Sequence, residues 1–367
     1  MPLHLRILRS GSSGNLTLVE NDAGVRMLID VGVTRSALLA ELDALSIDVR
    51  SLAGAVLTHA HGDHANPGAL ALLDAVGVPV HATPGTWAAV AQRAGTPVRG
   101  QSAGDLHPGR ALAIGGMTVH ACRVSHDNGT AGDAVCFRVE TGSEALGYAT
   151  DLGTVDDAVL ANLRGVGLLV LESNHDVDML AQTDRPYTTR AWIRGERGHL
   201  RNEQASAALA DLFDGREGGA AVLAHLSGKA NTPERALACA RAALRGRADI
   251  ALGVATGEGL RARWSLHGGN ATVNPYTPPL RSAEMFSAVT TRGYTCGGCG
   301  GSGHNRLTCP SRVRTGPFRA TPPATTSSPR SPSGLRRAYR CSSCGETGHN
   351  AATCGRADRL LAQGWVA

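Results

Sequence analysis

The segment Thr58-His59-Ala60-His61-Gly62-Asp63-His64 constrains this chain more than any other part of its sequence. It brings three histidines and one carboxylate together directly after the apolar residues 55–57, which predict the end of a buried strand. A loop at a strand end would hold these side chains near one point. Imidazole nitrogens and carboxylate oxygens are suitable ligands for zinc and similar divalent ions. The segment therefore predicts a metal site, and the less specific alternative is a polar surface loop.

Three later residues, each at the end of a predicted strand, extend this set of ligands: His126, Asp151 and His225. Each of them alone would more often be an ordinary core or surface residue. Together they complete two ligand sets, in which the first ion is held by His59, His61 and His126 and the second by Asp63, His64 and His225. The two oxygens of Asp151 could bridge both ions. We therefore expect a dinuclear centre with two divalent ions, zinc or manganese, about 3.5–4 Å apart.

Two further histidines are candidates for catalysis, as is the ligand Asp63. His199 precedes a predicted helix over residues 202–213. If a carboxylate orients it, an imidazole there could protonate a leaving-group oxygen near neutral pH. Glu203 is too close in sequence to be assumed as that carboxylate. His175 follows a predicted strand, and its alternatives are a catalytic role or a hydrogen bond that fixes its loop.

The order of the predicted elements indicates a layered α/β fold. Short strands are predicted over residues 3–8, 16–20, 25–30 and 78–81, and helices over 36–45, over 68–75 and from Pro84 onward. Residues 112–140 alternate between apolar and polar types without a helical period, which favours antiparallel strands in a second sheet. The Gly/Ser turn at residues 10–15 would either present backbone N–H groups to an oxyanion or form a plain hairpin loop.

Charge is distributed unevenly along the chain. Residues 281–367 carry 12 Arg and three acidic residues, a balance of +9, whereas the whole chain is +5, so residues 1–280 carry −4. A basic tail on an acidic body favours a polyanionic partner. Solubility or a compositional bias is the alternative, because Lys229 is the only lysine. Cys122, Cys136 and Cys239 lie singly in apolar segments and are expected to be buried thiols in a reducing compartment.

Several of these segments, in this order, resemble a known group of proteins. The motifs SGSSGN, THAHGDH, VSHD, TDLG, ESNHDVDML, GHLRNEQA and HLSGKANTPE look like those of the YycJ/WalJ group of the metallo-β-lactamase superfamily. The resemblance covers about residues 3–266 and implies a four-layer αββα sandwich. The group is related to the tRNase Z and RNase J phosphodiesterases and is associated with DNA exonuclease activity. Arg201 departs from its pattern, which usually has Ser after GHL, so contacts to substrate are expected to differ there.

The resemblance implies a nuclease in which a metal-activated hydroxide attacks phosphorus and His199 donates the proton. The aspartate at position 151, where many true β-lactamases have Cys, argues against lactam hydrolysis. No inserted domain of the β-CASP type fits between His175 and His225. Two alternatives remain: a small-ester, thioester or lactone hydrolase of the same fold, and a nucleic-acid-binding adaptor.

A short unit with metal-ligand spacing occurs twice in the tail. Both copies read CxxCxxxxHxxxxC, and their ligands are Cys296, Cys299, His304 and Cys309, then Cys341, Cys344, His349 and Cys354. This pattern resembles the CCHC zinc knuckle, because two thiolates from a tight turn, one imidazole and a further thiolate close a tetrahedral structural zinc site. So short a unit needs the metal in order to fold.

The knuckles are expected to bind single-stranded nucleic acid, DNA rather than RNA, through stacking and phosphate contacts. Residues 310–340 carry seven Arg and no acidic residue, but Gly or Ser fills the positions between the paired Cys, so protein docking is the alternative. The expected domains are a hydrolase domain at 1–267, a linker at 268–293, a first knuckle at 294–310, an Arg/Pro/Ser-rich linker at 311–338, a second knuckle at 339–356 and a tail at 357–367. No signal peptide or membrane span is predicted, so a cytoplasmic protein is expected.

Overall fold

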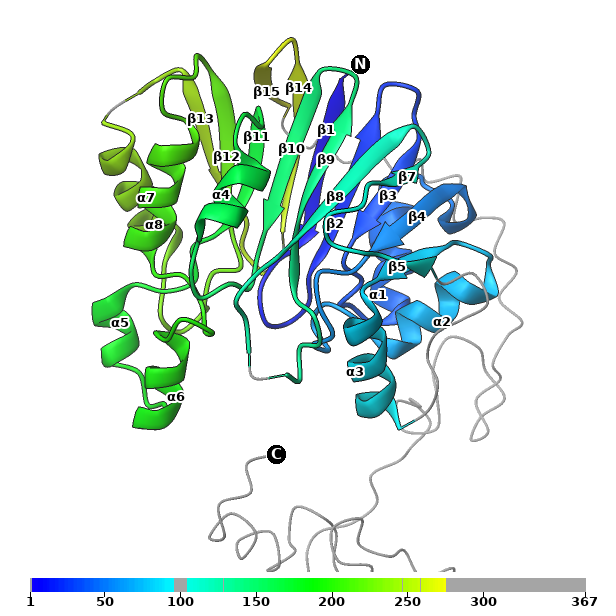
Figure 1. Ribbon diagram of the computed structural model, residues 1–367, viewed down its shortest axis with the longest axis horizontal. Coiled ribbons are helices and arrows are strands. Elements are labelled where there is room, and N and C mark those ends of the chain that lie inside the picture. The colour runs from blue at the N-terminus through cyan, green and yellow to red at the C-terminus, as the bar shows by residue number, and fades with distance from the viewer. Residues whose placement is uncertain (1, 96–103, 128, 246, 258, 275–367) are drawn as a thin grey trace, which may run out of the picture. The chain divides into compact units, whose positions relative to one another are not determined.

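The computed structural model of the chain describes residues 2–95, 104–127, 129–245, 247–257 and 259–274. These residues form the expected αββα sandwich, in which two sheets pack face to face between two layers of helices (Figure 1). Both predicted zinc knuckles, the linker between them and the C-terminal tail lie outside the described residues. The described helices are all too short or too polar to cross a lipid bilayer.

The first sheet contains eight strands in the order β15-β14-β1-β2-β3-β4-β5-β6. Its antiparallel part joins the two ends of the domain, whereas β3 to β6 run parallel. The strands are β1 (Leu3–Arg9), β2 (Leu16–Asn21), β3 (Arg26–Ile29), β4 (Leu52–Val56), β5 (Val80–Ala82), β6 (Gly104–Asp105), β14 (Leu260–His267) and β15 (Asn270–Asn274).

The second sheet contains seven strands in the order β13-β12-β11-β10-β9-β8-β7. The predicted antiparallel strands of residues 112–140 are confirmed as β7, β8 and β9, and β10 to β13 run parallel. The strands are β7 (Leu112–Ile114), β8 (Met117–Arg123), β9 (Val135–Thr141), β10 (Glu144–Ala149), β11 (Leu168–Glu172), β12 (Gly219–Ala224) and β13 (Ile250–Val254).

The helices within residues 35–94 cover the outer face of the first sheet, and those at 157–163, 202–212 and 233–243 cover that of the second. The two short helices within residues 177–193 lie at one end of the sandwich (Figure 1). Most of the helices begin at a side chain that accepts a hydrogen bond from the first turn, such as Thr34 for α1 and Thr83 for α3, which satisfies one otherwise unpaired N–H group. The helices are α1 (Arg35–Ala44), α2 (Pro67–Ala75), α3 (Pro84–Ala94), α4 (Asp157–Leu163), α5 (Val177–Ala181), α6 (Tyr187–Ile193), α7 (Asn202–Leu212) and α8 (Pro233–Ala243), with a 3₁₀ turn at η1 (Val49–Ser51).

Alternating side chains fill the space between the sheets. On β1, Leu3, Leu5 and Ile7 point inward and are about 1% exposed, and they meet Phe137 and Tyr148 from the opposite sheet. This alternation follows from the two-residue period of a strand. Of the three cysteines expected to be buried, Cys136 is buried, whereas Cys122 and Cys239 are only half-buried.

The first sheet continues past the predicted C-terminal boundary at residue 267. Gly268 and Gly269 have φ values of 59° and 76° and connect β14 to β15, which extends the first sheet to Asn274. A two-residue loop with positive φ at both positions is a favoured hairpin turn, and glycine adopts it readily. The Gly-Gly pair was interpreted from the sequence as the start of a linker, but it forms a turn inside the domain.

Candidate metal centre

The candidate ligands come from loops that follow strand ends in both sheets. His59, His61, Asp63 and His64 follow β4, which belongs to the first sheet. From the second sheet come three more, because His126 follows β8, Asp151 follows β10 and His225 follows β12 directly. The structure thus gathers all seven predicted ligands into groups whose ligand atoms lie within 4.8 Å of one another.

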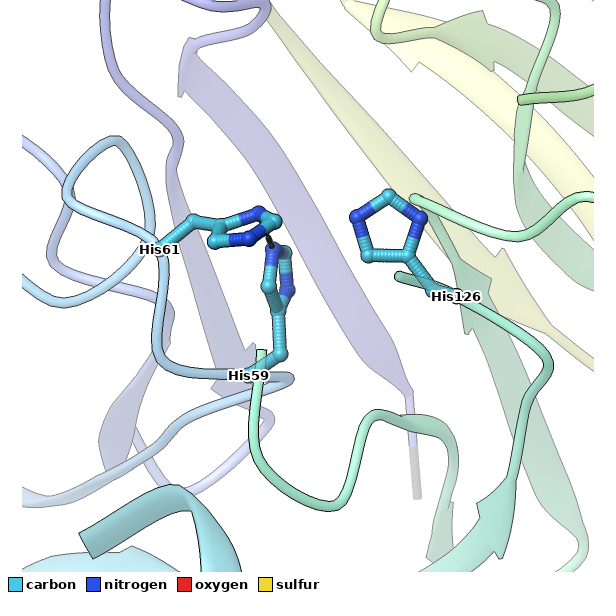
Figure 2. Close-up of side chains that lie close together, drawn as sticks. All are labelled: His59, His61 and His126. Atoms are coloured by element: carbon cyan, nitrogen blue, oxygen red, sulfur yellow. Dashed lines mark hydrogen bonds between the residues drawn. The ribbon is translucent and has the colours of Figure 1, made fainter. Parts of the chain in front are cut away.

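The first group contains His59, His61 and His126, whose ring centroids are 4.7–5.2 Å apart (Figure 2). One nitrogen of each ring faces a protein partner: Nδ1 of His59 lies 3.0 Å from Thr58 Oγ1, Nε2 of His61 lies 3.1 Å from Asp127 Oδ2, and Nδ1 of His126 lies 3.0 Å from Gly198 O. These partners favour the N–H group on that nitrogen of each ring, and the nitrogens left on His59 and His61 lie 3.0 Å apart, close enough to share one ion. Three lone pairs therefore remain for one ion.

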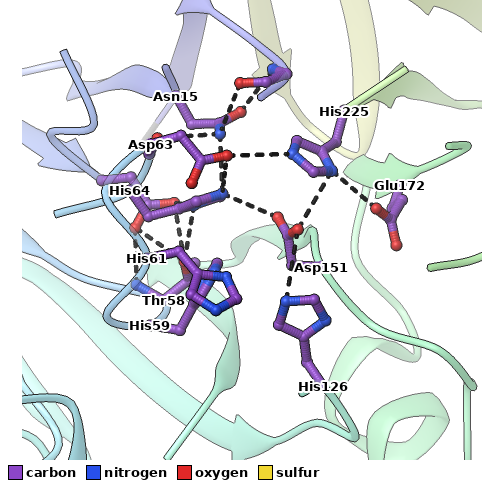
Figure 3. Close-up of polar contacts among 12 residues, drawn as sticks. Asn15, Thr58, His59, His61, Asp63, His64, His126, Asp151, Glu172 and His225 are labelled. Carbon is purple, nitrogen blue, oxygen red and sulfur yellow. Dashed lines mark hydrogen bonds and ion pairs between the residues drawn. The ribbon is translucent and has the colours of Figure 1, made fainter. Parts of the chain in front are cut away.

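The second group contains Asp63, His64 and His225 (Figure 3). His64 Nδ1 lies 2.7 Å from Asp30 Oδ2 and His225 Nδ1 lies 2.8 Å from Glu172 Oε1, which leaves Nε2 of both rings as the ligand atom. These two nitrogens lie 3.8 and 3.9 Å from Asp63 Oδ2. A carboxylate partner on the far nitrogen of a ligand histidine fixes its tautomer and makes it more basic.

Asp151 lies between the two groups. Its Oδ2 is 3.0 Å from His64 Nε2, and its Oδ1 is 3.8 Å from His126 Nε2. Two of the proposed ligand atoms are buried without a hydrogen-bond partner, namely His126 Nε2 and His225 Nε2. Unsatisfied buried polar atoms are costly and need an explanation. A pair of divalent ions fits them, because both are ligand types that such ions accept.

The electrostatics of the site also favour cations. Burial opposes charge on His225 and His64, but the carboxylates outweigh it: Asp151, Asp63 and Glu172 raise the pKa of His225 to about 10, and Asp151 and Asp30 hold the pKa of His64 well above its usual value. Burial lowers the pKa of His126, and burial together with the neighbouring His64 lowers the pKa of His59. His59 and His126 are therefore ready as neutral ligands, whereas His64 and His225 must release protons when an ion binds.

Four residues of the site have a left-handed backbone. Asp30, Asp127, Asp151 and His225 have φ values of 55–60°. This conformation is uncommon for residues other than glycine, and Asp and His are among those that adopt it more often. Such backbone strain is found preferentially at functional sites, where the surrounding structure maintains it.

The Gly/Ser turn at residues 10–15 supports the second group. Asn15 donates from Nδ2 to the carbonyl oxygen of Asp63 and lies 2.9 Å from His64 Nε2, and Ser10 Oγ accepts a hydrogen bond from the backbone N–H of His225. Gly32 packs so closely that a Cβ there would lie 1.6 Å from the carbonyl oxygen of Asp63. The loop of residues 58–64 is thus held from two sides, by Asn15 and by Gly32.

The carboxylate expected beside His199 is Glu172, at the end of β11. His199 Nδ1 lies 2.8 Å from Glu172 Oε1, which leaves Nε2 as the ring nitrogen available to a substrate. Glu172 is fully buried and accepts hydrogen bonds from the backbone N–H groups of Leu152 and Leu200. Burial opposes its ionisation, but His199 and His225 lower the pKa of Glu172 to about 2. The group is therefore a permanent carboxylate.

His175 lies apart from these contacts. It belongs to none of the metal-holding groups found among the described residues. The ring is 1% exposed, neither ring nitrogen has a hydrogen-bond partner, and burial lowers its pKa to about 4. Its catalytic role stays a prediction.

Sequence reasoning missed the residues that orient the ligands: Thr58, Asp127, Asp30 and Glu172. Two of them could have been found from the sequence. Asp30 follows β3 and Glu172 ends β11, so both lie at the end of a strand, as the candidate ligands do.

Comparisons with known proteins agree with this architecture. A family described as "Beta-lactamase superfamily domain" matches residues 25–226. The protein named Exodeoxyribonuclease YycJ from Bacillus anthracis is 32% identical over 240 residues, which cover 64% of this chain and 87% of the relative. Exodeoxyribonuclease WalJ from Streptococcus pneumoniae is 28% identical over 235 residues, or 63% of this chain and 84% of the relative. The crystal structure of the metallo-beta-lactamase fold protein YhfI from Bacillus subtilis shares the fold with a TM-score of 0.54 and 17% identity, covering 72% of this chain and 100% of YhfI.

Proposed function

Since this chain belongs to the family described as the beta-lactamase superfamily domain, we propose that it is a dinuclear-metal phosphodiesterase that acts as a DNA nuclease. Two relatives named exodeoxyribonuclease, which this chain matches over 84–87% of their length, support DNA as the substrate. The seven ligands and the partners that orient them support two ions. The proposal extends to the tail, whose CCHC units would hold structural zinc and keep nucleic acid near the site.

The residues of the site have two kinds of proposed role, metal binding and orientation of the metal ligands. His59, His61 and His126 would hold one ion, Asp63, His64 and His225 the other, and Asp151 would contact both. Bound divalent ions supply Lewis acidity toward a phosphoryl oxygen and lower the pKa of water. The buried carboxylates Asp30 and Glu172 keep the imidazole ligands oriented during turnover.

The observation that carries the proposal is the His199–Glu172 pair beside the metal groups. A phosphodiester leaves an alkoxide when it is cleaved, and this leaving oxygen needs a proton. His199 Nδ1 is held at 2.8 Å by Glu172 and lies 3.5 Å from Asp151, so its Nε2 can carry a proton toward the leaving oxygen. Glu172 keeps the ring oriented for this transfer through its contact with Nδ1. An acyl transfer from a thioester has far less need of such an acid, because a thiolate is a good leaving group.

The test is cleavage of end-labelled single- and double-stranded DNA and RNA by the metal-loaded protein, beside turnover of a bis-aryl phosphate and of a thioester. We expect DNA to be cleaved and Asp63→Ala to abolish cleavage. A chain ending at Asn274 should bind DNA more weakly than the full chain at moderate salt, and its affinity should depend less steeply on salt because it makes fewer phosphate contacts. Thioester turnover without cleavage of any nucleic acid would contradict the proposal and favour the small-ester alternative.

The role of His199 has its own test. His199→Ala is expected to reduce kcat for DNA by about 10²–10⁴-fold, the usual contribution of a general acid, while both metals stay bound. The exposed His107 offers a matched control, because His107→Ala removes an imidazole far from these contacts. Unchanged kcat in His199→Ala with full metal content would remove the assigned role. A better leaving group should also reduce the defect, since an aryl oxide needs less protonation than an alkoxide.

A further inference from the structure

Helix α6 exposes apolar side chains in an unusual way. Among the described residues, the exposed large hydrophobic side chains are Tyr187, Trp192 and Val273, and the first two both lie on this seven-residue helix. Tyr187 is 71% exposed and Trp192 is 36% exposed. Exposed aromatic side chains indicate a binding surface when groups that could recognise a partner lie beside them.

Trp192 borders the metal centre. Its ring centroid lies 5.4 Å from that of His199, edge to face at 88°, and 6.2 Å from that of His126. One of these histidines is a candidate metal ligand and the other the candidate acid. The indole is therefore a wall of the site, with part of its surface left open to solvent.

The position of the indole is fixed by the protein. The next residue, Ile193, is 4% exposed and packs with Leu180 and Ala230 in a small cluster of its own. The carbonyl oxygen of Ile193 accepts a hydrogen bond from the backbone N–H of His199 at 2.9 Å. Gly198 permits this close packing, since a Cβ there would lie 2.2 Å from the carbonyl oxygen of Trp192. Trp192 and His199 are thus held in one rigid unit.

The same segment is basic within an acidic domain. Residues 185–201 contain five Arg and one Glu, although residues 1–280 together carry a charge of −4. Arg190 is used internally, because it donates to the carbonyl oxygens of Thr183 and Arg185. Arg194 and Arg201 are exposed on the stretch that leads from α6 through His199 to α7, where Arg201 Nε lies 3.7 Å from Glu203 Oε2. Cations beside an aromatic wall are the combination that binds single-stranded nucleic acid.

We infer that Trp192 is the surface on which one unpaired base of the substrate strand stacks beside the bond to be cleaved, while the exposed Arg side chains of residues 185–201 contact the adjoining phosphates. The inference rests on the proposed function and narrows its substrate to strands with an unpaired base at the site. A base inside a duplex already stacks on its neighbours, so it must leave the duplex to reach the indole.

The experiment compares a short single-stranded DNA with the same DNA carrying an abasic residue next to the cleaved bond, and it measures both kcat/KM and Kd with the full-length, metal-loaded protein. Stacking on an aromatic side chain predicts that the natural strand is preferred by about 5- to 150-fold in the wild type. Trp192→Ala should abolish this preference, and Trp192→Phe should retain most of it. Tyr187→Ala, which removes the other exposed aromatic ring of α6, should leave the preference unchanged.

Each outcome is decisive. A purely structural role for Trp192 would lower kcat/KM equally for both strands, and this result would overturn the inference, as would an equal preference in wild type and Trp192→Ala. Base preference in Kd without cleavage of any strand would contradict the proposed function but support the stacking surface. Neither binding nor cleavage of the strands would overturn both, and α6 would then be a surface for a protein partner.

Discussion

At the scale of single residues, the site depends on which nitrogen of each histidine carries the proton. Thr58, Asp30, Asp127 and the carbonyl oxygen of Gly198 each face one ring nitrogen, and Glu172 faces two, on His199 and His225. The lone pairs that remain converge on two points. These partners therefore specify the metal centre as much as the ligands do, and they respond to mutation in a predictable way.

Asp30→Asn tests one of these partners. Asp30 is fully buried, and its carboxylate accepts from the backbone N–H and the hydroxyl of Thr58 as well as from His64. An amide would place its NH₂ group against one of these donors. We expect a 10- to 100-fold loss of affinity for one of the two ions.

Competition with a chelating indicator measures this loss. Asp22→Asn, at an exposed carboxylate in the turn after β2, provides the control. Equal affinities of Asp30→Asn and wild type for both ions would show that Asp30 does not support a ligand.

His175 gives a prediction about pH. Burial lowers its pKa from 6.5 to about 4. Between these two pH values His175 is therefore protonated in the unfolded chain but neutral in the folded protein. Its contribution to stability is therefore complete above the unfolded value and is lost as pH falls toward the folded value. His175→Leu should remove this loss, which amounts to about 1–2 kcal/mol between pH 7.5 and pH 5.

Urea unfolding of metal-free wild type and His175→Leu at both pH values measures the difference. Every other histidine is common to the two proteins, so their contributions cancel. Parallel losses of stability on acidification would mean that the ring is protonated in the folded protein.

At the scale of secondary-structure elements, the loop after β4 depends on close packing against the residues that follow β3. The backbone N–H of Val31 bonds to the carbonyl oxygen of His64, and Gly32 lies against the peptide between Asp63 and His64. Gly32→Ala would force a methyl group into this peptide. We expect the variant to lose the second ion and several kcal/mol of stability, as overpacking of a rigid contact does.

Thermal unfolding and metal content report both effects. Gly24→Ala is a useful comparison, because Gly24 has no atom near its missing Cβ although its φ is +73°. If Gly32→Ala kept its metals and its melting temperature, the close contact would be of no consequence.

Whether a residue's role could be predicted from the sequence depended on its place in these elements. Candidate ligands such as His59, Asp151 and His225 follow closely after apolar strands, so the sequence pattern predicted them at one edge of the sandwich. Asp127 and Glu172 were not assigned because their importance lies in partners 66 and 53 residues away, at His61 and His225, and no local pattern states such a pairing. The hairpin at Gly268 was missed for the opposite reason, since a glycine pair is equally typical of a turn and of a linker.

At the scale of the whole molecule, the candidate metal centre draws side chains from both sheets. The loop after β4 in the first sheet supplies four candidate ligands, and loops after three strands of the second sheet supply the remainder. Metal binding should therefore stabilise the packing of one sheet on the other, in addition to its role in chemistry.

Chelation tests this role. Removing the ions from a chain ending at Asn274, which lacks the predicted knuckles, should lower Tm by roughly 5–15 °C, and zinc should restore it. A double variant, His126→Ala with His225→Ala, should melt at the same temperature with and without chelator. If chelation left the wild-type Tm unchanged, the ions would not contribute to holding the sheets together.

The order of the ligands along the chain has a consequence for synthesis. The ribosome releases residues 59–64 first, when no partner from the second sheet exists, so a nascent chain at that stage offers only part of each ligand set. The three histidines proposed for the first ion are all present once His126 has emerged, whereas the set proposed for the second requires His225. A truncated product that ends before residue 225 would therefore lack a proposed ligand of the second ion.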